Sequence, residues 1–557
     1  MVLRLGMLCT IVLCATRVFA QSDTTVLAPI EIYGIRITPY AGGAKVNTLV
    51  LDNTVQTLAN SLSNEPSLYF KNYGNEQLST ISFRGTTASQ TAVLWNGINI
   101  NSPTLGQTDF STVPMFLFDE VLIQYGAGSA LVGTDAIGGS VSLNNKTILF
   151  SKNFSAMLYQ QVGSFGRLAT GLKFNGGNNK WHFSTNVFGF RIKNNFPYNS
   201  PAVGFTKRQH NAAVENEGIR QQIAYKINDV QQVSVEALYT HNFRQNQPTV
   251  TNTGANETID NKALRLALHY DLYSVLGAMR VTVAHLGDEQ EYTDDNSSLI
   301  STKQWVALLN VDKQLSDKLS VRWGGSTTRH EAQGDNYPSD LRESRYDAFT
   351  SLRYDLTTRW LLTANLRQTF FAKRYAPFAP SIGTQGLLYQ TSNSHLSLRG
   401  QATRAFRIPT LNDRYWLPVG NQNLQAEDAW QIETGINWKK KTAYIKIDGE
   451  LGYYKTHTTN MIVWLPNENS NWAPINLQRV NINGIETNIE VSGDVGDVTL
   501  AAKLAYSFTK SINKKGIDTT TEGKQLPYVP LHAARFMLSA AFSDWVFALH
   551  NNYTSMR

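Results

Sequence analysis

The chain has 557 residues, of which 42% are hydrophobic, 11% aromatic and 17% charged, with a formal net charge of +7. This composition fits a soluble enzyme and also a transmembrane β-barrel, because barrel strands alternate in polarity and give no hydropathy peak. The sequence contains no basic stripe interleaved with aromatic residues, so it gives nucleic-acid binding little support. Beyond residue 20, no stretch reaches the roughly 18 consecutive apolar residues of a membrane helix.

The first 20 residues have the pattern of a secretory signal peptide. Arg4 precedes an apolar run over residues 5–15, and the small-residue pattern at 18–20 suits cleavage by a signal peptidase. The alternative is a buried helix. The two cysteines of the chain, Cys9 and Cys14, both lie in this segment. The mature chain would therefore have none, which suits export through an oxidising compartment.

Two segments precede the long run of strands. Residues 21–52 are expected to form an N-terminal tail and the start of a small domain that spans residues 53–145. In the tail, residues Ile30, Glu31, Ile32 and Tyr33 form a short β-prone stretch, either a free segment or the first strand of that domain. Residues 53–62 carry apolar side chains at helical spacing and predict a helix with Asn53 as its N-cap.

From about residue 153 to the end, the sequence repeats one pattern, in which ten to fifteen residues of alternating polarity are followed by a turn. Segments 264–272 and 498–508 are clear examples. A period of two places one set of side chains on each face of a sheet. Short turns such as 227–230 alternate with long loops such as 193–214 and, further on, 289–299. This rhythm is typical of outer-membrane barrels and predicts a transmembrane β-barrel over residues 150–557.

About nineteen strands can be counted in this region. With an odd number, the first strand, near 154–163, and the last, near 545–553, would run in the same direction, and an antiparallel ladder could not seal between them. An open edge in hydrocarbon is costly, because its N–H and C=O groups have no partners there. We therefore expect the natural chain to continue beyond Arg557; the alternative is a count wrong by one strand.

Five motifs resemble the TonB-dependent outer-membrane receptors. Residues 64–74 (NEPSLYFKNYG), 77–97 (QLSTISFRGTTASQTAVLWNG), 109–126 (DFSTVPMFLFDEVLIQYG) and 129–143 (SALVGTDAIGGSVSL) follow the order of the receptor plug. In the predicted barrel, FRIPT at 406–410, GNQNL at 420–424 and Glu427 resemble a characteristic loop between two strands. The similarity thus covers nearly the whole predicted mature chain.

The resemblance implies an all-β membrane barrel, 22-stranded in the family, with a small α+β plug in its lumen. It also implies location in the outer membrane of a Gram-negative bacterium and active import of a small molecule by a monomer, with TonB and its inner-membrane complex as partners. No cofactor and no enzyme activity are expected, since the sequence shows no catalytic or phosphate-binding motif. About three strands of the family barrel would be missing.

The resemblance also assigns functional residues. The stretch of Ile30, Glu31, Ile32 and Tyr33 would be the Ton box, which pairs with TonB by strand addition. Arg84 of the FRG motif is expected to face barrel carboxylates and hold the plug closed. The family usually has Asp at the position of Asn96, and Arg and Pro where Tyr125 and Ala127 stand, so one plug–barrel ion pair of the family would be lost.

The plug motifs are most similar to those of cobalamin (vitamin B12) transporters. The alternatives are a ferric-siderophore receptor and, in another class, a passive porin or a surface-binding barrel. Haem is less expected, because residues 407–424 contain no histidine. Six residues of the predicted apex loops could hydrogen-bond a ligand: Tyr73, Asn75, Gln77, Asn99, Asn101 and Gln107. Carboxylates at 288–295, including Asp288, Asp294 and Asp295, are weak candidates for Ca²⁺ ligands, or else a solvated acidic loop.

Overall fold

A computed structural model of the chain describes residues 38–50, 55–63, 65, 68–145, 148–199, 206–248, 256–466, 471–515 and 521–556. The expected signal peptide at 1–20 and the stretch Ile30, Glu31, Ile32 and Tyr33 lie outside the described residues, as does Asn53. None of the described helices is long and apolar enough to cross a membrane.

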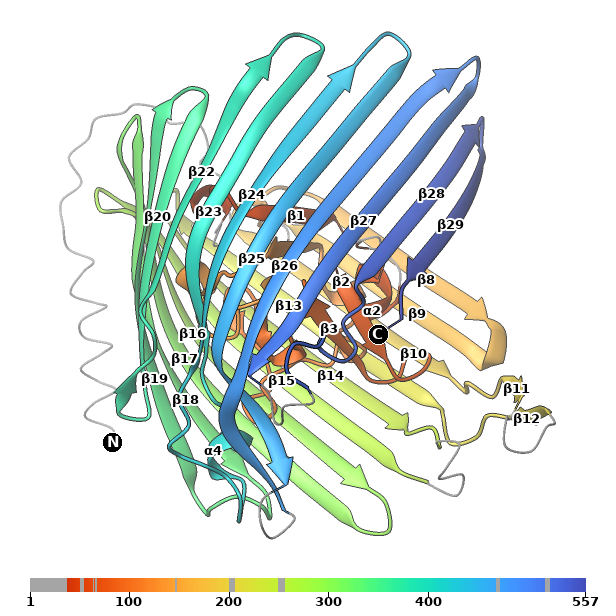
Figure 1. Ribbon diagram of the computed structural model, residues 1–557, viewed down its shortest axis with the longest axis vertical. Coiled ribbons are helices and arrows are strands. Elements are labelled where there is room, and N and C mark those ends of the chain that lie inside the picture. Colours follow the sequence, from red (N-terminus) through yellow and green to blue (C-terminus); the bar gives the residue numbers. More distant parts are fainter. Residues whose placement is uncertain are drawn as a thin grey trace. The chain divides into compact units, whose positions relative to one another are not determined.

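The N-terminal part forms a small plug with one five-stranded sheet in the order β1-β6-β7-β4-β5. Its red and orange elements are enclosed by the long strands in Figure 1. Its elements are η1 (Thr38–Tyr40), β1 (Lys45–Val50), α2 (Leu58–Leu62), β2 (Leu68–Asn72), β3 (Ser79–Phe83), η2 (Ala88–Gln90), β4 (Thr91–Trp95), β5 (Ile98–Asn99), η3 (Met115–Leu117), β6 (Glu120–Tyr125), α3 (Ser129–Val132) and β7 (Gly139–Asn144).

The predicted helix over 53–62 is shorter than expected. Helix α2 begins at Leu58, after Thr57, which forms a β-bridge with Pro114. The backbone of Gln56 accepts a hydrogen bond from Met115 N at 3.1 Å. This pairing with the η3 region holds residues 55–57 outside the helix, so tertiary contacts override the helical spacing there.

The remaining residues form long antiparallel strands whose order closes into a barrel. These strands are β8 (Phe154–Gly163), β9 (Arg167–Gly177), β10 (Trp181–Ile192), β13 (Val214–Asn228), β14 (Gln231–Gln245), β15 (Thr258–Ser274), β16 (Gly277–Thr293), β17 (Ser297–Ser316), β18 (Leu319–Gln333), β19 (Leu341–Thr357), β20 (Trp360–Phe371), β22 (Ala379–Gln390), β23 (Ser394–Arg407), β24 (Glu427–Lys441), β25 (Ile445–Pro466), β26 (Trp472–Val495), β27 (Val498–Lys515), β28 (His532–Phe542) and β29 (Trp545–Thr554). Shorter elements occupy the connections: η4 (Ser164–Gly166), β11 (Pro197–Asn199), β12 (Thr206–Arg208), β21 (Arg374–Tyr375) and α4 (Leu411–Tyr415).

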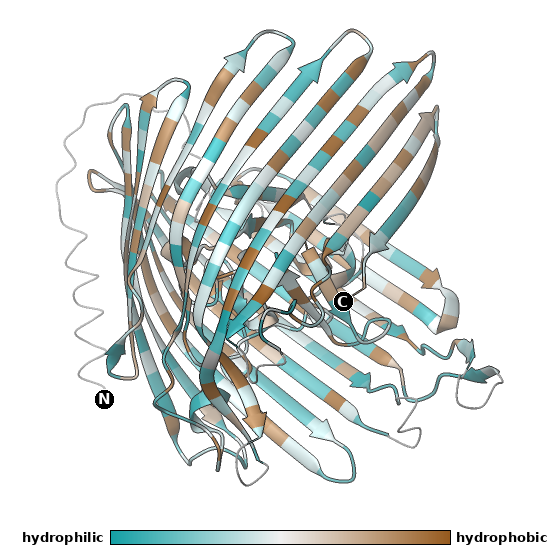
Figure 2. Ribbon diagram, in the orientation of Figure 1, coloured by the Kyte–Doolittle hydropathy of each residue, from teal (hydrophilic) through white to brown (hydrophobic). Residues whose placement is uncertain are grey.

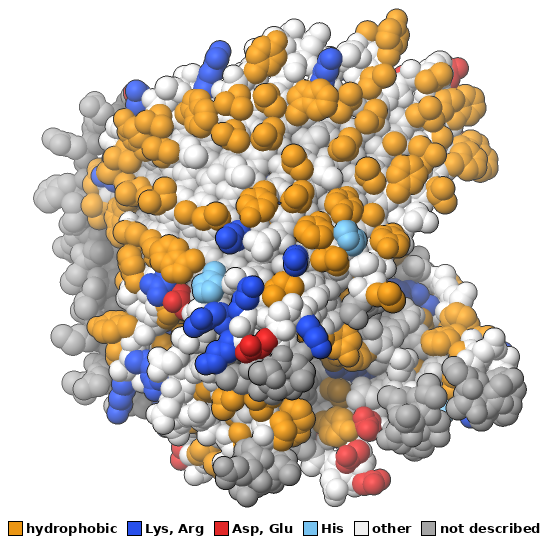
Figure 3. All heavy atoms as spheres, viewed as in Figure 1, with side chains coloured by type: hydrophobic (Ala, Val, Ile, Leu, Met, Phe, Trp, Pro, Cys, Tyr) orange, Lys and Arg blue, Asp and Glu red, His pale blue; other side chains and the backbone are white. Residues whose placement is uncertain are grey.

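The barrel strands are apolar outside and polar inside. On β15, Leu266 is 39% exposed, whereas its neighbour Arg265 is 6% exposed and faces the lumen. Figure 2 shows this alternation along the strands, and Figure 3 shows hydrophobic side chains spread over the outer surface of the barrel. A soluble sheet would bury the leucines, so this inverted pattern is that of a barrel in lipid. The predicted fold, a β-barrel around a plug, is confirmed.

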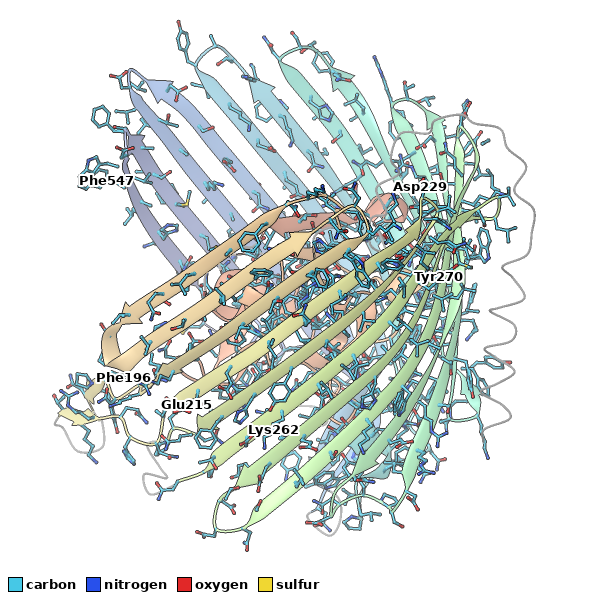
Figure 4. All side chains as sticks on the ribbon, turned by 180° about the vertical axis from the view of Figure 1, so that it is seen from behind. Phe196, Glu215, Asp229, Lys262, Tyr270 and Phe547 are labelled. Atoms are coloured by element: carbon cyan, nitrogen blue, oxygen red, sulfur yellow. The ribbon has the colours of Figure 1, made fainter. Side chains whose placement is uncertain are left out.

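Short turns and longer connections alternate between the two ends of the barrel. In Figure 4, Asp229, in the short turn between β13 and β14, lies at the opposite end of the strands from Glu215 and Lys262. One predicted loop, 289–299, is not a loop. Strand β16 continues to Thr293 and β17 begins at Ser297, because the period-two pattern persists through the acidic residues.

The count of about nineteen strands is confirmed, apart from the two-residue β21. The strand order places β29 next to β8. Each pair of long strands that follow one another from β8 to β29 is antiparallel, as β8–β9 and β28–β29 show at the two ends of the series. Since the directions alternate, β8 and β29 run parallel, as the odd number predicts.

The plug contacts the barrel wall through both apolar and charged side chains. Its main apolar cluster, which includes Trp95 and Phe116, packs against inward side chains of β9 to β17, such as Phe188 and Val306. Ion pairs connect the plug to β24–β26 and also to β9 and β14. Apolar packing and ion pairs therefore both hold the plug against the barrel wall.

Candidate functional site

Two plug motifs meet the loop between β23 and β24. Ile408 N in that loop donates a hydrogen bond to Thr134 Oγ1 at 2.9 Å. Leu411 N, at the start of α4, donates to the carbonyl of Pro103 in the plug at 2.9 Å. The loop from FRIPT into α4 thus docks on both the 99–107 and the 129–135 regions of the plug.

Arg407 holds the two ends of this loop together. Its guanidinium donates to Glu427 at 2.8 Å and to Asp413 at 3.3 Å, and all three side chains are buried. Gln90 of the plug donates to the second oxygen of Glu427 at 2.8 Å. Arg407 is therefore a structural residue of the loop, and through Glu427 the plug takes part in the same network.

Six charged side chains from the plug and the barrel form a closed ring of alternating sign. The members are Arg84 and Lys45 of the plug, Arg399 (β23), Glu433 (β24), Glu450 (β25) and Glu486 (β26). The closest N–O distances are 2.7 Å for Arg84–Glu433, 3.0 Å for Arg399–Glu450, 3.2 Å for Lys45–Glu450, 3.6 Å for Lys45–Glu486 and 2.9 Å for Arg84–Glu486, and Arg399 also contacts Glu433.

Arg84 makes the most extensive contacts of this ring. It forms two hydrogen bonds each to Glu433 and Glu486, and its guanidinium lies 4.4 Å from the ring centre of Tyr454. Burial alone would lower the pKa of Arg84, but the two carboxylates outweigh it and hold that pKa well above its usual value. Arg84 adopts a positive φ of 49°, a strained conformation that the surrounding contacts maintain.

Sequence reasoning missed Lys45. Lys45 is the first residue of β1 and lies directly opposite Tyr125 in the antiparallel register with β6. Its ammonium group is 4.9 Å from the centre of the Tyr125 ring, which makes a cation–π contact. Tyr125 occupies the position where the resemblance to receptor plugs leads us to expect Arg. The positive charge missing there is thus present one strand away, and a lone lysine gives no sequence pattern that could have revealed this.

Asn96, where the family usually has Asp, faces a barrel carboxylate. Its amide donates to Glu236 Oε2 at 2.9 Å, and Arg220 pairs with Glu236 Oε1 at 2.7 Å. A carboxylate at position 96 could not donate this hydrogen bond and would repel Glu236. The presence of Asn rather than Asp at position 96 therefore suits the carboxylate of Glu236 on the barrel wall.

Three of the six predicted ligand residues lie in the plug segment 73–77, where Asn75 and Gln77 contact the 193–213 connection. Tyr73 is 47% exposed, and Asn75 is also exposed and donates to Asn194 Oδ1 at 2.9 Å. Gln77 is buried, and its amide donates to the carbonyls of Ala212 and Gln245. Only Tyr73 and Asn75 of this group present side chains to the surface.

The other three lie in the plug turn near α4. The Asn101 amide is buried and donates to the carbonyls of Thr91 and Gly106. Asn99 donates to Asp135 Oδ2 at 2.9 Å, and Gln107 closes the turn by accepting from Ser102 N. The six residues thus form two separate groups. The buried amide of Asn101 bonds to backbone carbonyls of the plug, whereas that of Gln77 bonds to backbone carbonyls of the barrel.

A cavity of about 140 Å³ lies between this part of the plug and barrel strands β17–β20. Its plug side includes Asn99, Asn101 and Asp135, and its barrel side includes Arg322 and His330. Asp135 is buried, and burial raises its pKa above the ordinary value despite the hydrogen bonds from Thr134 and Asn99. The cavity brings one group of predicted ligand residues next to the barrel wall.

The acidic residues proposed for Ca²⁺ are not grouped. Asp288 forms an ion pair with Arg265 at 2.5 Å, and Asp294 accepts from Asn296 N in the β16–β17 turn. Asp295 is exposed in that turn. Among the described residues, no three His, Cys, Asp or Glu side chains are placed to hold one metal ion.

Comparison with known proteins agrees with this geometry. Residues 46–140 match the TonB-dependent receptor plug domain, and residues 149–557 match the family described as TonB dependent receptor-like, beta-barrel. The chain is 25% identical over 511 residues to the vitamin B12 transporter BtuB of Photobacterium profundum, covering 88% of this chain and 78% of that protein. It is 25% identical over 505 residues to BtuB of Vibrio vulnificus, covering 86% and 75%.

Solved structures share the fold at lower identity. The copper transporter OprC superimposes with a TM-score of 0.74 at 16% identity, covering 91% of this chain and 84% of that one. The FrpB iron transporter of Neisseria meningitidis does so with a TM-score of 0.74 at 14% identity, covering 92% and 87%. The family consists of transporters and receptors rather than enzymes, and it implies interaction with TonB and a small-molecule ligand. The chain belongs to the TonB-dependent receptors, the β-barrel transporters of the Gram-negative outer membrane.

Proposed function

We propose that this chain imports cobalamin or a related corrinoid across the outer membrane. The observation that carries this proposal is the similarity to vitamin B12 transporters, which extends over 88% of the chain and so over plug and barrel together. A ferric siderophore is the alternative substrate. A passive porin is disfavoured, because a ring of six paired charges holding a plug in the lumen has no use in an open pore.

The size of the cavity beside Asn99 and Asn101 decides whether such a ligand can first bind there. At about 140 Å³ it is smaller than the roughly 300–1,000 Å³ of pockets for drug-sized ligands, and a corrinoid is larger than those. We therefore place the first contact on the outer face, where Tyr73 and Asn75 are exposed. Asn99, Asn101, Gln107 and Gln77 would contribute once the plug turns rearrange.

TonB would act on the N-terminal tail. The segment of Ile30, Glu31, Ile32 and Tyr33 has the β-prone pattern for strand addition to a partner sheet. Ligand must favour the state in which this segment is accessible, because equal affinity for both states would shift nothing. Arg84 and Lys45 would hold the plug until force on the tail separates them from Glu433, Glu450 and Glu486.

The test combines binding with energised uptake. Purified outer membranes containing the full chain are titrated with cyanocobalamin, with ferrichrome as the comparison. Saturable binding of cyanocobalamin supports the proposal, whereas binding of ferrichrome alone moves the assignment to siderophores. Binding of neither probe would contradict both substrates.

TonB dependence is tested with two variants at one position. Ile32→Pro removes a backbone N–H that strand pairing needs, whereas Ile32→Ala keeps it. We expect Ile32→Pro to abolish uptake without changing binding, and Ile32→Ala to retain most uptake. Normal uptake by Ile32→Pro would contradict import through this segment and would favour passive diffusion.

A further inference from the structure

The wall of β17 and β18 that faces the cavity carries buried polar atoms without partners. Gln304 Nε2, Asn310 Nδ2, Arg322 Nε and both ring nitrogens of His330 have no hydrogen-bond partner among the described residues. All four side chains line the cavity and are at most 5% exposed. Leaving a buried donor unpaired costs free energy, so four such groups on two adjacent strands require an explanation.

These groups form two clusters along the same pair of strands. Gln304 and His330 are directly opposite each other in the β17–β18 register, and Arg322 donates to Asn310 Oδ1 at 2.7 Å. His330 lies near the end of β18 that leads into the longer 334–340 connection, whereas Arg322 lies near the short turn at its start. At about 3.3 Å per residue, the clusters are roughly 20–26 Å apart along the strands.

The plug side of the cavity is mixed in character. Leu94, Leu122 and Leu131 line it together with the polar Asn99, Asn101 and Asp135, opposite the hydrogen-bond donors of the barrel side. The charged ring holds the plug to another wall, β23–β26. Movement of the plug away from β17–β19 would therefore widen this cavity while the ion pairs between the plug and β24 stay intact.

We propose that the β17–β18 wall is a transit site for the imported solute, binding its hydrogen-bond acceptors in two steps. The chemistry that fits is carbonyl, carboxylate or phosphate oxygen on a molecule that also has an apolar face. Gln304 with His330 would bind such oxygens first, and Asn310 with Arg322 next. This inference rests on the proposed import function and adds its route and the class of ligand group.

Two variants test the transit site. Gln304→Leu and Asn310→Leu each remove an amide nitrogen that has no partner among the described residues, and both keep similar volume. Thermal stability should stay equal or rise in Gln304→Leu, but it should fall in Asn310→Leu, because Asn310 Oδ1 accepts a hydrogen bond from Arg322. Cyanocobalamin binding to outer membranes should be unchanged, while the initial rate of energised cyanocobalamin uptake should fall about 3- to 10-fold, the worth of one hydrogen bond to the moving solute.

Asn242→Leu is the matched control. Asn242, on β14, is also a buried amide without a partner among the described residues, but it does not line the cavity. Its uptake should equal that of the unchanged chain. Unchanged uptake by both Gln304→Leu and Asn310→Leu, with binding intact, would overturn the transit site but leave the import function standing.

An equal loss of uptake in Asn242→Leu would also overturn the transit site, because the loss would then not depend on residues that line the cavity. If the unchanged chain binds ferrichrome instead of cyanocobalamin, the corrinoid assignment fails and the same three variants are compared in ferrichrome uptake with the same expectation. If it binds neither probe, the proposed function fails, and the transit site fails with it.

Discussion

Lys45 Nζ lies 3.2 Å from Glu450 Oε2, so the first strand of the plug sheet is ion-paired to barrel strand β25. Lys45 also contacts Glu486 at 3.6 Å, which closes the ring that Arg84 shares. Since β1 is an edge strand of the sheet and the first described strand after the N-terminal tail, this pair lies on the plug strand nearest in sequence to that tail.

Replacing Lys45 tests whether it stands in for the Arg that related plugs carry at position 125. Lys45→Gln leaves Glu450 and Glu486 short of one positive charge, and we expect a looser plug that a protease added from outside cleaves faster. Adding Tyr125→Arg should restore the slow cleavage, because residue 125 lies opposite residue 45 in the register. If the double variant is cleaved as fast as Lys45→Gln, Lys45 does not stand in for an Arg at position 125.

Arg84→Gln should have the largest effect on closure. Removing one partner of a buried ion pair costs about 3–5 kcal/mol, because the remaining carboxylates are left uncompensated. We expect passive entry of a large hydrophilic antibiotic into cells that express the variant, measured as growth inhibition. Arg265→Gln is the control, since Arg265 pairs with Asp288 within the barrel. Equal inhibition by both variants would argue against a plug lock at Arg84.

Asn96→Asp should weaken the contact between plug and barrel. The new carboxylate would face Glu236 in place of the amide that donates to it at 2.9 Å, at a cost of about 1–3 kcal/mol. The measurement is thermal unfolding of the purified protein. Combining Asn96→Asp with Glu236→Gln should recover part of the loss, and no recovery would mean that the repulsion lies elsewhere.

Asp135 predicts a pH dependence of plug stability. Its pKa is raised in the folded state, chiefly by burial, against the lowering effects of Thr134, Arg345, Arg407 and Asn99. The folded plug therefore holds the Asp135 proton more tightly than the unfolded chain does. The stabilisation that this gives is fully present below the pKa of Asp135 in the unfolded chain, and it is lost as pH rises through the raised pKa of the folded state. We expect Asp135→Asn to flatten the fall in thermal stability above about pH 4. A profile identical to that of the unchanged chain would contradict this assignment.

The sequence predicted the barrel well because its information is local. A period of two fixes which residues face lipid, and Leu266 and Arg265 lie as that period requires. The prediction was weaker where pairing between residues far apart in the sequence determines the bounds of an element. Helix α2 begins late because Thr57 pairs with Pro114, and the 289–299 loop is a tight turn between strands.

The candidate site was predictable only in part. Motif similarity identified Arg84. The alternation of polar and apolar residues along a strand predicts which side of the sheet a side chain faces, but not which side chain it contacts. Glu433 and Glu486 could therefore not be predicted as the partners of Arg84. The side chains of Asn101 and Gln77 look like ligand donors in the sequence, yet each serves backbone carbonyls nearby in space. The same amide side chains occur in turns and in ligand-binding sites, so only the folded structure shows which of the two roles each residue has.

The ring of charges also determines the electrical character of the lumen once the plug has moved. The plug contributes two cations, and the wall of β23–β26 contributes Arg399 with three carboxylates, Glu433, Glu450 and Glu486. Displacing the plug would therefore uncover a wall with two excess negative charges. Such a wall attracts cations and repels anions within about 10 Å. An anionic solute with carboxylate or phosphate oxygens would be driven away from it, toward the donors of β17 and β18 on the other side.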